Sequence, residues 1–189
     1  MKDPAFITEM VSKGLHAKEK ASKFSELTAG QLNWKPSEEK WSVGQCLDHL
    51  IVSDCSYFPQ FEEIVSGTHE MTFWEKWNPF NGLWGKVMVT QVQEKPKRKL
   101  KAPKVIRPTQ SNVAPEIYQR FQKHLDSLLD YIRDCHDTDI DRLHITSPVS
   151  RFITYSLRNA IQLLMQHEHR HLNQAMAVIL EGAFPTIHD

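Results

Sequence analysis

The chain has 189 residues, which is enough for one domain with a sizeable core, and we expect a single domain over residues 1–189. Its 23 basic residues balance its 23 acidic residues, so the net charge predicts no general attraction to nucleic acid or anionic lipid. Three cysteines without metal-type spacing favour reduced thiols, and no apolar run predicts a signal peptide or a membrane span, so we expect a cytoplasmic protein.

The first half of the chain predicts two long helices with clear starting points. Asp3 followed by Pro4 is typical of a helix start, and apolar residues follow at helical spacing: Phe6, Met10, Ala17, Ala21 and Phe24. Thr28 with Gln31 forms a capping box for a short turn, and Ser42 with Gln45 forms one for a long second helix. The second helix is expected to end near Gly67 and to bury Val43, Leu47, Leu50, Asp54, Tyr57 and Phe61.

The second half predicts two more helices. The third begins at Pro115, with a stripe made of Ile117, Phe121, Leu125, Leu128, Ile132 and Cys135. The fourth runs from about Tyr155 until Gly182 ends it. Because no segment shows sustained alternation of apolar and polar residues, we expect an all-α four-helix bundle.

The connection between the second and third helices, about residues 67–113, is longer than a hairpin needs and could run back along the bundle, making these helices parallel. Its first half concentrates aromatic residues and is expected to pack over the bundle: Trp74, Trp77, Phe80 and Trp84. Its second half, Lys95 to Arg107, is basic and rich in proline. We interpret it as a solvated strap rather than a nucleic-acid contact.

Three histidines fall close together in "QLLMQHEHRHLNQAM", residues 162–176. His167 and His171 lie one turn apart on the inward half of the fourth helix, whereas His169 points away from both. Two imidazoles at this spacing can bind one metal ion, but a buried pair satisfied by hydrogen bonds explains them equally well. Candidates for a further ligand are His49 on the second helix, His124 beside the stripe of the third, and Cys46, which is more often a buried thiol.

Two segments together, "LNWKPSEEKWSVGQCLDHL" and "HEHRHLNQA", resemble the DinB-like metal-binding four-helix bundle superfamily, which includes bacillithiol transferases and mycothiol-dependent maleylpyruvate isomerases. The resemblance implies helices running up, down, down and up. It also implies that His49, His167 and His171 ligate one divalent metal ion, which leaves His124 and His169 outside the ligand set. Three imidazoles and water suit zinc, nickel, copper or iron, and we expect zinc or nickel.

Three neutral imidazoles leave the metal an open position, as in catalytic zinc sites. The resemblance favours a thiol S-transferase acting on small electrophiles, with a low-molecular-weight thiol as a candidate substrate. A hydrolase using a metal-bound water and a non-catalytic, metal-stabilised binding or stress protein stay open. Candidates for a general base or for orienting a ligand are Glu168, Asp48 and Gln174. Glu168 is a poor ligand by its helical angle. Expected partners are a small-molecule substrate and, as an open alternative, a second copy in a homodimer, but neither nucleic acid nor membrane.

Overall fold

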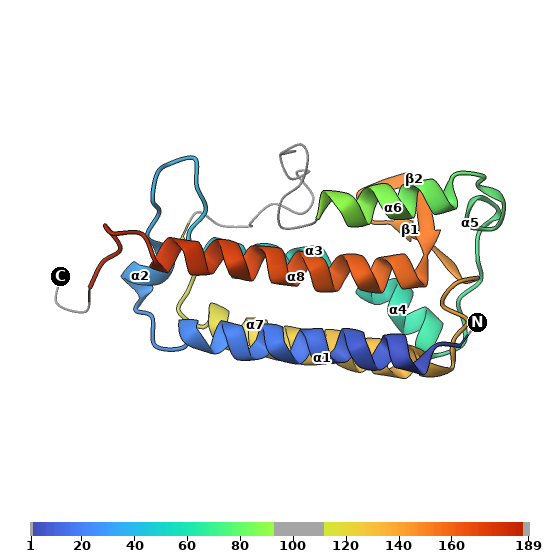
Figure 1. Ribbon diagram of the computed structural model, residues 1–189, viewed down its shortest axis with the longest axis horizontal. Coiled ribbons are helices and arrows are strands. Elements are labelled where there is room, and N and C mark those ends of the chain that lie inside the picture. The colour runs from blue at the N-terminus through green and yellow to red at the C-terminus, as the bar shows by residue number, and fades with distance from the viewer. Residues whose placement is uncertain (1, 93–111, 187–189) are drawn as a thin grey trace.

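Four long helices dominate the computed structural model, which describes residues 2–92 and 112–186 (Figure 1). They are α1 (Pro4–Ala21), α3 (Val43–Cys55), α7 (Ile117–Asp134) and α8 (Leu157–Ile179). Shorter helical segments connect them: η1 (Ser22–Phe24), α2 (Ala29–Asn33), α4 (Phe58–Val65), α5 (Phe73–Trp77), α6 (Asn81–Gln91) and η3 (Cys135–Asp137). The basic strap predicted at Lys95 to Arg107 lies entirely outside the described residues.

The long helices form a closed four-membered bundle, in which α3 packs on α8 and α7, and α1 packs on the same two helices. Figure 1 shows α1 and α8 running in one direction and α3 and α7 in the other. The all-α fold, the up, down, down, up order and the parallel arrangement of α3 and α7 are therefore as predicted. The long connection is what allows two helices consecutive in the bundle to run in parallel.

The helix starts follow the predicted capping chemistry. The Asp3 carboxylate accepts a hydrogen bond from the Phe6 backbone N–H at 3.1 Å, with Pro4 in the first turn. The boxes at Thr28 and Ser42 are both complete, since each hydroxyl accepts from a backbone N–H that the helix would otherwise leave unpaired. A third box, which we did not predict, joins Thr72 to Glu75 at the start of α5.

The predicted second helix is broken, so its continuation to Gly67 was wrong. α3 ends at Cys55, and α4 begins at Phe58. Pro59 explains the break, because it has no N–H to donate and its ring would collide with the carbonyl of Cys55, four residues earlier. After the break α4 packs against α7, and Phe61 stays in the core.

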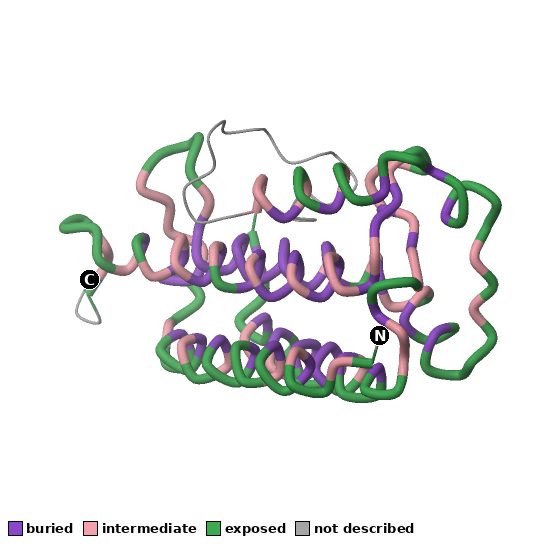
Figure 2. Tube along the Cα trace, turned by 45° about the vertical axis from the view of Figure 1, so that its right-hand side comes forward, coloured by how far each residue is buried: buried purple, intermediate pink, exposed green. Residues whose placement is uncertain are grey.

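The core follows the predicted apolar stripes (Figure 2). Fully buried side chains from all four long helices or their ends fill it, among them Phe24, Leu47, Leu50, Phe121, Leu125, Leu128 and Leu164. Asp54 is also fully buried at 0 % exposure, as its place in the stripe of the second helix predicted. A charged group at such a depth needs a partner or a proton.

A β-hairpin between α7 and α8 was not predicted. β1 (His144–Ser147) pairs antiparallel with β2 (Ser150–Ser156), with Ile145 opposite Tyr155. Each strand is too short to show sustained alternation in the sequence. Tyr155 therefore lies in a strand rather than in the fourth helix, and Ser156 caps α8 by accepting a hydrogen bond from the Asn159 N–H at 3.3 Å.

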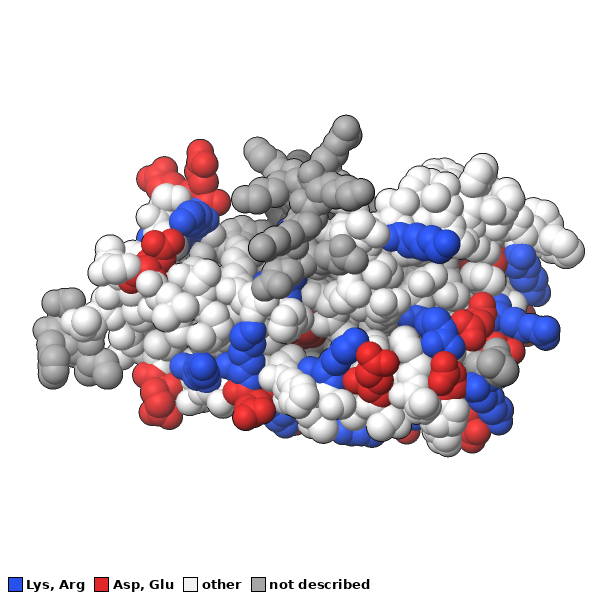
Figure 3. Space-filling model, viewed as in Figure 1, with Lys and Arg blue, Asp and Glu red and all other residues white. Residues whose placement is uncertain are grey.

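The aromatic segment packs over the bundle, as expected, with α6 lying on α8 and β2. Gly85 allows this approach, because a Cβ there would lie 2.1 Å from the side-chain nitrogen of Asn159 on α8. Several large rings nevertheless stay exposed, including Phe73 at 76 % and Trp77 at 71 %. Figure 3 shows a largely uncharged surface over α5 and α6, whereas side chains of both signs cover the region of α1. None of the described helices is both long and apolar enough to cross a membrane.

Candidate metal centre

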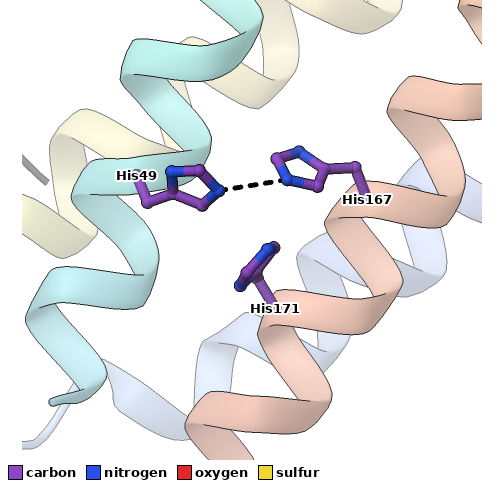
Figure 4. A group of neighbouring side chains, drawn as sticks. All are labelled: His49, His167 and His171. Atoms are coloured by element: carbon purple, nitrogen blue, oxygen red, sulfur yellow. Dashed lines mark hydrogen bonds between the residues drawn. The ribbon is translucent and has the colours of Figure 1, made fainter. Parts of the chain in front are cut away.

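Three histidines from two helices meet in the interior of the bundle (Figure 4). His49 comes from α3, and His167 and His171 come from α8; their rings converge on the space between these helices. One ring nitrogen of each lies within 4.8 Å of the other two, and the Nε2 atoms of His49 and His167 are 3.1 Å apart. All three are almost fully buried, at 1 %, 6 % and 6 % exposure. The structure thus brings together the three residues that the resemblance implied.

The bundle positions these rings through ordinary helix geometry. The Ser42 capping box fixes where α3 begins, and the packing of α3 on α8 then places His49 opposite the histidine pair. Residues four apart on α8 share one face, so His167 and His171 both point inward. His169 is exposed, as its position on the opposite face predicted.

Trp41 covers the histidine cluster from the segment before α3. Its ring centroid lies 4.8 Å from that of His49 and 5.5 Å from that of His171, and it stacks on the latter with an interplanar angle of 24°. Its contact with the imidazoles was missed, because nothing in the local pattern indicates which way the ring turns.

The interior of the cluster favours the neutral form of His171. Burial lowers the pKa of His171 well below its ordinary value, and the neighbouring His167 and His49 lower it further, whereas a hydrogen bond with Gln174 acts in the opposite direction. The Nδ1 atoms of His167 and His171 are buried without a hydrogen-bond partner. The 3.1 Å between the Nε2 atoms of His49 and His167 falls in the range of about 3.0–3.4 Å expected for neighbouring ligands of one divalent ion with bonds of about 2.1 Å. The donor set therefore fits a metal ion.

A second buried cluster lies beside the first, formed by Asp54 of α3, His124 of α7 and Glu168 of α8. One potential ligand atom of each lies within 4.8 Å of the others, and their exposures are 0 %, 7 % and 0 %. His124 Nε2 lies 3.3 Å from Asp54 Oδ2. The structure places both His124, the rival ligand, and Glu168, the candidate base, in this cluster.

The two carboxyl groups of this second cluster differ in their pKa. Burial acts to raise the pKa of Asp54, but the hydrogen bond with His124 and the nearby His167 ring outweigh it and hold that pKa below its ordinary value. Burial raises the pKa of Glu168 well above its ordinary value, and the negative charge of Asp54 raises it further. An aspartate within an apolar stripe is visible in the sequence, and His124 and Glu168 are candidates there for other roles, but no pattern in the sequence predicts that these three residues meet.

The remaining candidates lie outside both clusters. Asp48 is buried at 2 % exposure on α3, and Gln174 is half-buried beside His171. Cys46 is fully buried and belongs to neither cluster, and burial raises the pKa of its thiol. This position fits the alternative interpretation of Cys46 as a small buried thiol that packs in the core.

A small cavity of about 60 Å³ adjoins the histidine cluster through His167. Hydroxyl groups line one part of it, and apolar side chains line another: Ser53, Ser56 and Tyr57, then Met88, Val92 and Leu163, with Pro148 and Val149 of the hairpin turn. The Tyr57 and Tyr155 hydroxyls are 2.8 Å apart and hydrogen-bond to each other. The cavity has room for a few water molecules or one small substituent.

The comparisons with known proteins agree with this architecture. The family model of the DinB superfamily matches residues 19–175, a range that contains both buried clusters. Neither the curated proteins nor the solved structures gave a match. The matched range covers most of the chain, and buried histidine and carboxylate groups that could hold a metal ion lie within it. The chain belongs to the DinB superfamily.

Proposed function

We propose that His49, His167 and His171 bind one divalent metal ion, zinc or nickel, and that the protein transfers a low-molecular-weight thiol to a small electrophile. The observation that carries the metal site is the convergence of three buried imidazoles from two packed helices. The thiol step rests on the family and on the chemistry of this donor set.

The ligand set determines which chemistry the site supports. All three proposed ligands are neutral, so they leave the full positive charge of the ion in place. When bound, the ion would supply a Lewis acid that holds a thiol as its nucleophilic anion or lowers the pKa of a water molecule. Trp41 and the packed helices keep bulk water away from the imidazoles, which strengthens electrostatic interactions there.

The residues around His167 offer a place for the reacting group of a small electrophile. Apolar contacts would come from Met88, Val92 and Leu163, and the Ser53 hydroxyl faces the same cavity. The cavity is far smaller than a typical ligand site of roughly 300–1,000 Å³. We therefore propose that only the reactive end of the electrophile enters it.

The three candidate polar residues take different roles in this proposal. Gln174 hydrogen-bonds to His171 and orients its ring. Glu168 faces Asp54 and His124 rather than the histidine cluster, so we do not assign it the role of general base. Asp48 is buried on α3 and belongs to neither cluster, so we assign it no role in the reaction.

The experiment loads the apoprotein with cobalt(II) and titrates it with cellular low-molecular-weight thiols. We expect a sulfur-to-cobalt charge-transfer band that is lost in His171→Ala and kept in His169→Ala. The second variant is the matched control, because it removes an exposed histidine from the same helix.

Two other outcomes would replace the proposal. No band with any thiol, together with metal-dependent cleavage of an ester or amide panel, would assign the site to hydrolysis. No band and no cleavage, with metal bound stoichiometrically, would assign it to stabilising a non-catalytic binding protein.

A further inference from the structure

The cluster of Asp54, His124 and Glu168 leaves buried polar atoms without partners. Asp54 Oδ1 and both carboxylate oxygens of Glu168 are buried and make no hydrogen bond within the described residues. Each such atom costs about 1–3 kcal/mol when it is neutral and more when it is charged. Folded proteins retain few atoms of this kind, so a group that satisfies these three oxygens is to be expected.

The charges of the cluster indicate that the missing group is a cation. Two carboxyl groups lie in the bundle core, and the ion-pair partners that the described residues offer to Asp54 are histidines: His124 at 3.3 Å and the Nδ1 of His167 at 4.0 Å. No lysine or arginine in residues 2–92 and 112–186 forms an ion pair with either acid. Once both carboxyl groups have lost their protons they carry a charge of −2, which one divalent cation cancels.

The geometry provides three convergent donors from three helices. The 3.3 Å between His124 Nε2 and Asp54 Oδ2 falls in the range of about 3.0–3.4 Å expected for neighbouring ligands of one ion with bonds near 2.1 Å. Two contacts fix the orientation of the His124 ring. Cys55 Sγ lies 3.5 Å from its second nitrogen, Nδ1, and the Phe58 ring stacks on it with centroids 5.1 Å apart. Such support is typical of a metal-ligating imidazole.

From these contacts we propose that Asp54, His124 and Glu168 form a second divalent-metal site, next to the histidine cluster. Two carboxylates and one imidazole suit a cation that prefers oxygen ligands, such as manganese(II), whereas three imidazoles suit zinc or nickel. The two sites adjoin, because Glu168 follows His167 in α8 and the Nδ1 of His167 faces Asp54. This inference does not depend on the thiol transfer proposed above.

A proton held between Asp54 and Glu168 is the competing explanation. It would neutralise one carboxyl group and leave the other paired with His124. The two explanations predict different results when glutamine replaces Glu168. Glutamine preserves the volume and can donate the hydrogen bond of a protonated acid, but its amide is a poor metal ligand.

The test measures manganese binding to the full-length apoprotein by electron paramagnetic resonance, after one equivalent of zinc has filled the histidine cluster. We expect the unaltered protein to bind one manganese(II) ion per chain. Glu168→Gln and His124→Ala should each weaken this binding at least tenfold, and His169→Ala should leave it unchanged. In His171→Ala, titrated without zinc, manganese binding should persist, so a failure of the first site stays distinguishable from a failure of the second.

Circular dichroism of each variant shows whether it folds, and Glu168→Gln decides the question if His124→Ala does not. The absence of manganese binding in the unaltered protein would overturn the proposal. Equal binding in Glu168→Gln would also overturn it and would assign the cluster to a shared proton.

Discussion

The two buried clusters share α3 and α8, the second adding His124 of α7, and their pKa values respond to burial in opposite directions. In the histidine cluster, burial lowers the pKa of His171, so the group gives up a proton. In the neighbouring carboxylate cluster, burial raises the pKa of Glu168, so the group keeps one. Burial favours the neutral form in both cases. One environment thus yields free imidazole lone pairs in one cluster and a buried acid in the other.

Removal of the metal ion should produce the largest change in the free energy of unfolding, and this change should come from the histidine cluster. An ion that binds only the folded protein, present at about 1,000 times its Kd, stabilises it by about 4 kcal/mol. We expect a chelator to lower the free energy of unfolding by this order in the unaltered protein and to have little effect in His49→Ala. Urea unfolding with and without one equivalent of zinc measures both, and an equal response of the two proteins would contradict the ligand assignment.

The carboxylate cluster should make the apoprotein less stable as the pH rises. The folded-state pKa of Glu168 lies well above its ordinary value of 4.5, so its contribution is complete below pH 4.5 and is lost as the pH rises through the folded-state pKa. Over that range the loss is about 1.4 kcal/mol for each pH unit. Subtracting the unfolding curve of Glu168→Gln from that of the unaltered apoprotein isolates this slope. A flat difference would show that burial does not hold a proton on Glu168.

The histidine cluster should make the stability of the apoprotein depend on pH in the opposite direction. Because the folded-state pKa of His171 lies well below its ordinary value of 6.5, the unfolded chain binds more protons, and stability falls as the pH drops below 6.5. Other groups begin to titrate near pH 4.5, so the usable range is short and the total is about 1–2 kcal/mol. The difference curve between the apoprotein and His171→Gln should rise with pH; a falling curve would be inconsistent with a buried, neutral His171.

His169 should produce the smallest effect. Its side chain is exposed on the outer face of α8, between the two proposed ligands. His169→Ala should change the free energy of unfolding by less than about 0.5 kcal/mol and leave the metal content intact. Loss of metal in this variant, measured by elemental analysis, would mean that helix position does not determine which histidines bind.

The two clusters also differ in how far the sequence reveals them. His167 and His171 share a short spacing on one helix, and His49 follows a capping box, so local pattern and family resemblance together identify all three. Asp54, His124 and Glu168 come from three helices, and no sequence spacing relates them. Glu168 illustrates the difficulty, since the helical angle that turns it away from the histidine cluster turns it toward α7.

The fold shows the same division between local and non-local information. Helix starts depend on a few adjacent residues, and the boxes at Thr28 and Ser42 are where the sequence places them. Pro59 also indicates a helix break in the sequence, but the apolar stripe that continues past it predicted one unbroken helix. The hairpin could not be predicted, because its short strands are stabilised by pairing with each other and by packing of β2 on α6.

Anomalous X-ray scattering tests most directly whether His49, His167 and His171 hold a metal ion. Crystals would be grown from protein purified without an affinity tag, and data collected on both sides of the absorption edge of the metal found by elemental analysis. We expect an anomalous peak about 2.0–2.3 Å from one ring nitrogen of each of the three histidines. A peak bound by other residues, or none in this cluster when metal is present at one equivalent or more, would contradict the central claim.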